Sequence, residues 1–108
     1  MKNILLFSLL LITVTSGTSF EVRLDSNATT GYQWQLAGKL DEKTVKFLGH
    51  EYQLPLKGVL RVGQGGQEVW HFQALKPGKT ALNFNYLRVW EKGAKPARMK
   101  RVEVKINP

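Results

Sequence analysis

The feature that most constrains the fold of this chain is an alternation of apolar and polar residues with a period of two. It is clearest where Leu82, Phe84 and Tyr86 alternate with Asn83 and Asn85, because successive side chains of a β-strand point to opposite faces of the sheet. The same period recurs in short segments separated by turns that contain Gly or Pro, and no segment after residue 17 has a helical period. This pattern is typical of an all-β, immunoglobulin-like β-sandwich of about seven short strands.

The alternation also predicts which side chains form the core. We expect the inner faces of the sheets to carry Trp34, Val45, Phe72, Leu82, Phe84 and Val104. A change of phase near Leu48 predicts a β-bulge, since a bulge inserts one extra residue into a strand. The chain of 108 residues has no cysteine, so a domain of this size has to be held together by packing rather than by disulfides.

The N-terminal segment has the layout of a secretory signal peptide. Lys2 precedes the uncharged apolar run of residues 4–14, and small residues follow at positions 15–17. The run is shorter than the roughly 20 residues that a membrane-spanning helix needs. We therefore expect residues 1–17 to be removed and residues 18–108 to be a mature domain that is periplasmic or secreted and has no membrane partner. The alternative is that the apolar run is the first strand of a cytosolic domain.

The charged residues favour a binding protein over an enzyme. The formal net charge is +8, but the basic residues are scattered along strands and turns, which is typical of a solvated surface. His50 and His71 are the only histidines, and neither has a partner at metal-ligand spacing. Because the acidic residues are mostly isolated, we expect them to face outward and to form no acid–base pair. We expect no enzymatic activity, no metal and no cofactor.

The first of three unusual stretches lies between two predicted strands. Asn27 and Gly31 bracket Ala28 and the β-branched pair Thr29 and Thr30. Gly31 can supply a positive φ, and Asn27 can bond its side chain back to the backbone. The threonines are stiff at χ1, so they hold their shape. This composition favours a preorganised loop tip that is offered to a partner.

Two further stretches lie at predicted loop positions. Gly63, Gly65 and Gly66 leave a backbone that can lie close against another surface. Arg88 and Trp90 follow a predicted strand and are of the residue types most enriched at interface hot spots. Alternate connections of an immunoglobulin-like sandwich emerge at the same end. We therefore expect all three stretches to form one continuous edge.

Together these stretches resemble the chagasin family of cysteine-peptidase inhibitors, whose signatures are Asn-Pro-Thr-Thr-Gly-aromatic, Gly-x-Gly-Gly and Arg-Pro-Trp (or Phe). The chain has Asn-Ala-Thr-Thr-Gly-Tyr at 27–32, Gly-Gln-Gly-Gly at 63–66 and Arg-Val-Trp at 88–90, in the same order. The resemblance covers roughly residues 20–106. Ala28 and Val89 stand where the family has proline, which removes a φ restraint from each loop. Family members also have a strand before residue 20, which leader cleavage would remove.

The resemblance implies a reversible inhibitor of papain-like cysteine peptidases, which we expect to be a monomer. Its tip at 29–31 would cover the catalytic Cys–His pair without being cleaved. The glycine stretch would lie along one cleft wall, and the third stretch would hold the other. These separate grips would comprise the peptidase-binding residues Asn27, Thr29, Thr30, Gly31, Tyr32, Gly63, Gly65, Gly66, Arg88 and Trp90.

The origin of the chain and a second class of function follow from other features. Residues 27–29 form a glycosylation sequon, and a glycan there would obstruct the site, which favours a bacterial exported protein. The alternative function is a carbohydrate- or nucleic-acid-binding β-domain that uses basic charge and exposed tryptophan. That alternative would require aromatic residues spread over a sheet face, whereas most of them here alternate in phase with core positions. We therefore expect no nucleic-acid partner.

Overall fold

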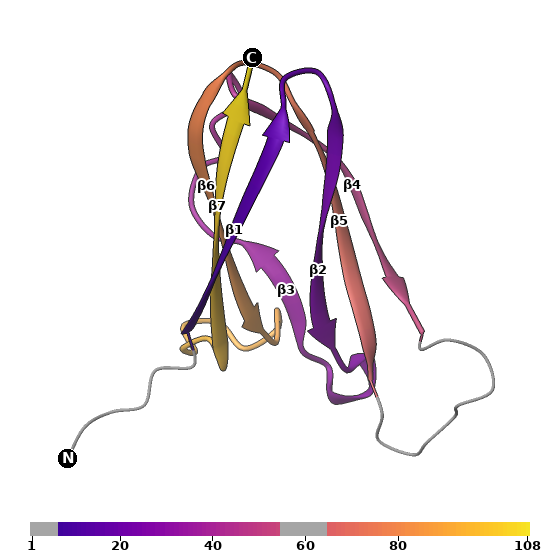
Figure 1. Ribbon diagram of the computed structural model, residues 1–108. Coiled ribbons are helices and arrows are strands. Elements are labelled where there is room, and N and C mark those ends of the chain that lie inside the picture. Colours follow the sequence, from indigo (N-terminus) through magenta and orange to yellow (C-terminus); the bar gives the residue numbers. More distant parts are fainter. Residues whose placement is uncertain (1–6, 55–64) are drawn as a thin grey trace.

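The alternating segments form strands that pair into two facing sheets (Figure 1). The computed structural model describes residues 7–54 and 65–108. In these residues, one sheet has the strand order β1-β7-β6-β3 and the other has the order β2-β5-β4. The strands are β1 (Phe7–Thr15), β2 (Ser19–Ser26), β3 (Gln33–Leu36), β4 (Val45–Gln53), β5 (Gly66–Ala74), β6 (Gly78–Leu87) and β7 (Arg98–Asn107), with one 3-10 turn, η1 (Ala28–Thr30), between β2 and β3. The predicted all-β sandwich is confirmed.

The core lies between the two sheets and consists of the side chains that the alternation predicts. Each of these predicted residues is at most 1 % exposed: Trp34, Val45, Phe72, Leu82, Phe84 and Val104. Trp70 packs across the interior against Phe84, with the ring centroids 5.2 Å apart in an edge-on arrangement. Burial of these large apolar side chains is the main favourable term in the folding of a domain without disulfides.

A β-bulge interrupts β4 where the change of phase predicts one. The pairing of β4 with β5 shifts register between Phe47 and Gly49, which leaves Leu48 without an opposite partner and 50 % exposed. After the shift, His50 lies opposite Trp70, and the two rings stack with centroids 4.3 Å apart. The bulge therefore sets which face of the sheet the rest of β4 presents to the core.

The N-terminal apolar segment forms the edge strand β1 of the larger sheet. β1 pairs in parallel with β7, from Phe7 opposite Met99 to Thr15 opposite Asn107. Ile12 and Val14 pack against the core. Cleavage near residue 17 would remove this strand, and that cleavage stays a prediction.

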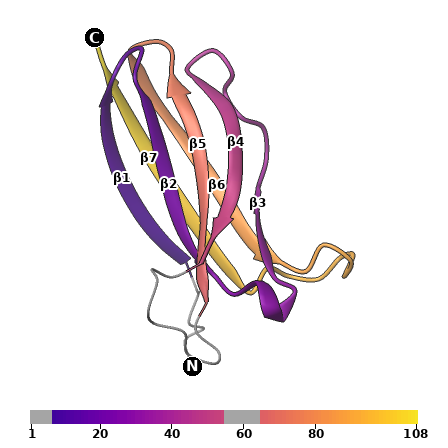
Figure 2. The same ribbon diagram turned by 90° about the vertical axis from the view of Figure 1, so that its right-hand side faces the viewer.

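The connections between strands alternate between the two ends of the sandwich. In Figure 1, β2, β4 and β6 end at the lower end, where β3, β5 and β7 begin, and the other connections turn at the upper end. Figure 2 shows the same division from the side. The lower end therefore carries the first and third predicted loop stretches and the described part of the second, Gly65 and Gly66, as expected for an immunoglobulin-like sandwich.

Candidate functional site

The loop between β2 and β3 is folded around the side chain of Asn27. Its Oδ1 accepts hydrogen bonds from the backbone N–H of Thr29 at 3.1 Å and from the Thr29 hydroxyl at 2.6 Å. The Asn27 carbonyl oxygen accepts two more from Thr30, from the N–H at 3.1 Å and from the hydroxyl at 2.7 Å. These bonds confirm that Asn27 bonds back to its own loop, and they close the turn η1 where the family has a proline.

Gly31 ends this turn and is covered by Trp90. Its φ is +83°, in the left-handed region that glycine adopts readily and other residues rarely do, which confirms the predicted positive φ. A Cβ atom built on Gly31 would overlap Cη2 of Trp90 and would lie 3.1 Å from its Cζ2. Trp90 itself remains 63 % exposed. Its ring therefore covers the glycine and still presents an apolar face to solvent, as an interface anchor does.

Arg88 ties the β6–β7 connection to the same loop. Its Nε donates a hydrogen bond to the carbonyl oxygen of Thr30 at 3.2 Å, and its guanidinium lies over the ring of Tyr32, 4.5 Å from the centroid. Glu91 contacts the guanidinium at 3.4 Å. A hydrogen bond and two ring contacts therefore join the first and third loops in the free protein, and the expectation that the loops act as separate grips on a partner stays a prediction.

Gly65 and Gly66 bring the start of β5 against its neighbours. A Cβ atom on Gly65 would lie 2.5 Å from the carbonyl oxygen of Ser26 and 3.1 Å from Cα of Asn27, and one on Gly66 would overlap the carbonyl oxygen of Gln53. Neither glycine has a positive φ. The close approach of backbones, rather than a special turn conformation, therefore requires glycine at both positions.

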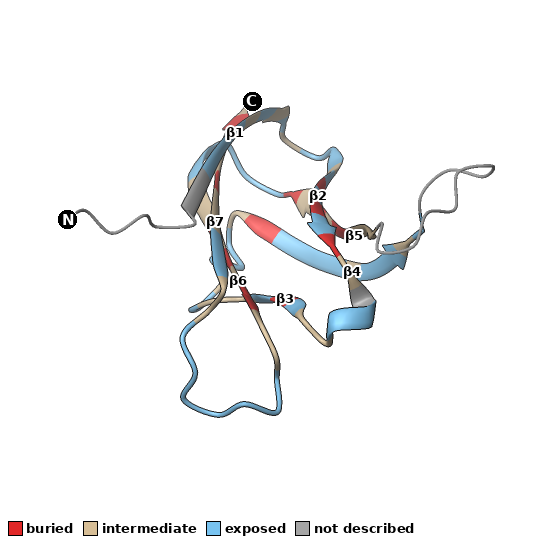
Figure 3. Ribbon diagram, turned by 90° about the horizontal axis from the view of Figure 1, so that it is seen from below, coloured by how far each residue is buried: buried red, intermediate tan, exposed pale blue. Residues whose placement is uncertain are grey.

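The structure brings the described members of the predicted site to one end of the sandwich, which Figure 3 views from below. Thr29 and Thr30 of η1 and residues 89–95 of the β6–β7 connection are exposed at this end. The predicted residues found there are Asn27, Thr29, Thr30, Gly31, Tyr32, Gly65, Gly66, Arg88 and Trp90; Gly63 lies outside the described residues. Their role in binding a partner stays a prediction.

Two tyrosine hydroxyls beneath the loops were not among the predicted site residues. The hydroxyl of Tyr86 accepts a hydrogen bond from the N–H of Asn27 at 3.0 Å. The hydroxyl of Tyr52 donates to the carbonyl oxygen of Ser26 at 3.3 Å and accepts from the N–H of Gly66 at 2.9 Å. These hydroxyls thus connect the stem of the first loop to β6, β4 and β5. The Ser26 hydroxyl also lies 3.5 Å from the hydroxyl of Tyr86. The other partners named here are backbone groups, which leave no signal in the sequence.

One acidic residue also lies beneath the loops. The expectation that the acidic residues face outward is wrong for Glu68, which is 5 % exposed. Its position is in phase with Trp70, Phe72 and Ala74, whose side chains are buried in the same strand. That phase is the sequence signal by which Glu68 could have been found, because alternate residues of a strand share one face.

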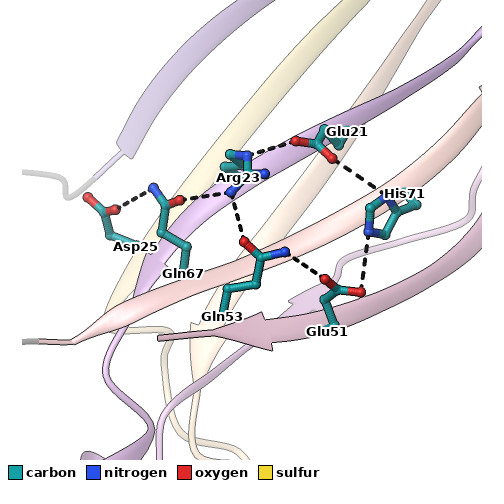
Figure 4. A network of polar contacts seen from close by, with 7 residues as sticks. All are labelled: Glu21, Arg23, Asp25, Glu51, Gln53, Gln67 and His71. Atoms are coloured by element: carbon teal, nitrogen blue, oxygen red, sulfur yellow. Dashed lines mark hydrogen bonds and ion pairs between the residues drawn. The ribbon is translucent and has the colours of Figure 1, made fainter. Parts of the chain in front are cut away.

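The outer face of the β2-β5-β4 sheet carries a network of polar side chains (Figure 4). His71 lies between two carboxylates, with Nδ1 3.8 Å from Glu21 and Nε2 3.7 Å from Glu51. Arg23 donates hydrogen bonds to Glu21 at 2.7 Å and to Gln53 at 3.1 Å. These side chains are substantially exposed, so the network has the character of a solvated surface, where ion pairs contribute little to stability.

The part of the chain that the structure describes has neither a metal centre nor a membrane-spanning helix. No group of three or more His, Asp or Glu side chains there could hold a metal ion. Across residues 7–54 and 65–108, no helix has the length and apolar character needed to cross a membrane.

Comparison with known proteins points to one family. The profile described as "Chagasin family peptidase inhibitor I42" matches residues 13–106, beginning inside β1. Chagasin from Trypanosoma cruzi is 33 % identical over 82 residues, which cover 73 % of this chain and 73 % of that protein.

Solved structures share the fold. A cysteine protease inhibitor from Entamoeba histolytica superposes with a TM-score of 0.68 at 20 % identity, covering 94 % of this chain and 97 % of that one. PbICP-C, solved in complex with falcipain-2, gives a TM-score of 0.66 at 20 % identity, covering 99 % and 96 %. At such identities the structures show the fold alone. The family profile and the relationship to chagasin supply the identity, and the chain belongs to the chagasin family of peptidase inhibitors.

Proposed function

We propose that this protein is a reversible inhibitor of papain-like cysteine peptidases and that its three lower loops occlude the active-site cleft. Its family is one of inhibitors, not of enzymes. A protein of the same fold, PbICP-C, was solved in complex with falcipain-2, a papain-like cysteine peptidase. The observation that carries the proposal is that Arg88 bonds to Thr30 and that Trp90 packs on Gly31. These contacts fix the shape of the tip and place it beside an exposed aromatic side chain.

The tip of the first loop is suited to block a nucleophile without reacting with it. Thr29 and Thr30 are exposed, and their hydroxyls bond to Asn27. Cleavage of the loop would require the turn η1 to open into an extended strand, which would break these bonds. We therefore assign residues 29–31 to the centre of the cleft, over the catalytic Cys–His pair, as the part of the inhibitor that remains uncut.

The other two loops are assigned to the walls of the cleft. Gly65 and Gly66 lie against the stem of the first loop, and Arg88 and Trp90 contact its tip at Thr30 and Gly31. Because contacts within the free protein already hold these elements, docking orders few side chains and costs little conformational entropy. A rigid, preformed edge is the physical basis for tight binding by an interface that makes no covalent bond.

Titration of papain tests the proposal directly. We expect cleavage of a dipeptide substrate to fall as the protein is added, to recover on dilution, and to leave the inhibitor with its intact mass. Heat-denatured protein serves as the control for nonspecific loss of activity. If neither papain nor any other papain-like peptidase is inhibited, or if the tip is cleaved during inhibition, the proposed function is wrong.

We also propose that the protein is exported from a bacterial cell. Lys2 followed by the apolar run of residues 4–14 supports export. The sequon at 27–29 supports a bacterial origin, in a cell that does not glycosylate Asn27. A glycan on this side chain would interfere with the tip, which is folded around Asn27. Export with cleavage near residue 17 and retention of β1 exclude each other, so the N-terminus of the mature protein decides between them.

A further inference from the structure

Glu68 lies on the inner face of the smaller sheet, at the end that carries the loops. In β5 it is opposite Leu24 of β2 and Tyr52 of β4, and its side chain is directed into the sandwich, where it is 5 % exposed. No lysine or arginine within residues 7–54 and 65–108 forms an ion pair with it. Burial of a carboxylate raises the free energy of the folded state unless hydrogen bonds satisfy its oxygens. The hydrogen-bond partners of Glu68 therefore indicate its role.

The partners of Glu68 are the two stems of the first loop. Its Oε2 accepts a hydrogen bond from the hydroxyl of Ser26 at 2.7 Å, and Ser26 is the last residue of β2. Its Oε2 and Oε1 also share the backbone N–H of Trp34, at 3.1 and 3.2 Å. Since β3 is at the edge of its sheet, the N–H of Trp34 bonds to this carboxylate from the other sheet. One side chain therefore fixes both ends of the segment from Asn27 to Gln33.

The remaining contacts of Trp34 show that the fold does not depend on Glu68 alone. The indole Nε1 of Trp34 donates to the carbonyl oxygen of Asp25 at 3.0 Å, and its ring packs on Tyr86 with centroids 4.8 Å apart. These contacts hold the side chain of Trp34 in the core. Glu68 holds its backbone instead, and the backbone is the part that continues into the loop.

We propose that Glu68 is a positioning residue for inhibition, one that keeps the tip at 29–31 in its binding conformation before a peptidase arrives. This inference rests on the proposed function. A loop released from one stem spends only part of its time in the competent conformation, and the apparent dissociation constant rises in inverse proportion to that fraction. Charge-assisted hydrogen bonds are stronger than neutral ones, so a neutral side chain of the same shape should hold the stems less well.

The test compares Glu68→Gln, Glu68→Ala and Ser26→Ala with Glu42→Gln, a control that removes the same charge from an exposed turn at the opposite end. Amide hydrogen exchange of the free proteins is followed by NMR at Trp34 and at the core residues Phe72 and Phe84. Inhibition constants are measured for papain. For Glu68→Gln we expect protection at Trp34 to fall by about tenfold with the core amides unchanged, and the inhibition constant to rise by about tenfold.

The other variants keep the inference falsifiable. Ser26→Ala should lower the protection at Trp34 and raise the inhibition constant, each by about threefold. If Glu68→Ala does not fold, Ser26→Ala and Glu68→Gln together still test the inference. Unchanged inhibition by Glu68→Gln, or protection lost equally at Trp34 and in the core, would overturn the inference. If the wild-type protein inhibits no papain-like enzyme, the proposed function fails, but exchange at Trp34 still decides whether Glu68 holds the loop.

Discussion

The indole ring of Trp90 lies directly on Gly31, with no space between them for even a methyl group. The third loop thus covers the tip of the first, and Arg88 donates a hydrogen bond to the preceding carbonyl oxygen, that of Thr30. These contacts make the two loops one surface. A substitution in either loop is therefore expected to change the shape of the other.

Gly31→Ala is expected to weaken inhibition strongly. The left-handed conformation costs an alanine about 1–2 kcal/mol, and the new methyl group would displace Trp90. We expect the inhibition constant to rise by about tenfold or more, and further for Gly31→Val. Gly38→Ala is the matched control, because Gly38 has a φ of +77° and open space around its Cβ position. An inhibition constant for Gly31→Ala equal to that of Gly38→Ala would show that the contact with Trp90 is unimportant.

Trp90→Ala should remove a binding anchor while leaving the sandwich folded. If the ring is buried in the complex, its loss costs on the order of 2 kcal/mol of binding, about 30-fold in affinity. The ring is 63 % exposed in the free protein, so melting curves should change little. Leu75→Ala, an exposed apolar residue at the opposite end, should leave inhibition unchanged. Wild-type inhibition by Trp90→Ala would remove the third loop from the mechanism.

Arg88→Lys is expected to behave like a loss of the side chain although it keeps the charge. Lysine has no Nε–H at the position that bonds to Thr30 and no planar group to lie on Tyr32. We expect the inhibition constant to rise by about fivefold for both Arg88→Lys and Arg88→Ala. Arg101→Lys in β7 is the control. Full inhibition by Arg88→Lys would mean that charge alone matters at this position.

Deletion of residues 1–17 should destabilise the domain, because it removes β1 and with it the packing of Ile12 and Val14 against the core. Complete burial of an aliphatic side chain contributes about 1.5–3 kcal/mol, so two partly buried ones predict a loss of about 2 kcal/mol or more. Urea unfolding of the full chain and of residues 18–108 measures the difference. Equal stability of the two proteins would show that β1 is not part of the working fold.

The mature N-terminus is a separate measurement on the exported protein. The leader layout predicts that N-terminal sequencing starts near Gly17. A chain that starts before Phe7 would contradict the leader prediction and would keep β1 in the sandwich.

The salt dependence of binding separates peptidase inhibition from binding of nucleic acid. An interface held by shape and apolar contact should lose less than about tenfold in affinity between 50 and 200 mM salt, whereas a protein that contacts several phosphates loses about 10³–10⁵. Measuring the inhibition constant across this range, with single-stranded DNA binding followed in parallel, checks the prediction. A steep salt dependence together with tight DNA binding would favour the alternative function.

The features that could be predicted from the sequence are local ones. Alternation identifies the core because each strand carries its own period, and the bulge near Leu48 disturbs that period visibly. Asn27 bonds within its own loop, and the positive φ of Gly31 follows from its place at the end of a tight turn. Each of these depends on residues only a few positions apart.

The features that could not be predicted depend on distant pairings. Arg88 and Thr30 are 58 positions apart, so nothing in either motif reveals that they bond. Glu68 occupies a core position, but its partners Ser26 and Trp34 are 42 and 34 positions away. An apolar segment such as residues 7–15 has the composition of a leader, and only its parallel pairing with β7 makes it a strand.

The close approach of Gly65 to Ser26 and Asn27 has a consequence for how such an inhibitor acquires new targets. Where backbone atoms pack on backbone atoms, any side chain at position 65 would push the second loop away from the first. Diversification is therefore confined to positions whose side chains face solvent, such as Gln33 and Val89, which is 48 % exposed. A library built to retarget this protein should vary those positions and leave the glycines untouched.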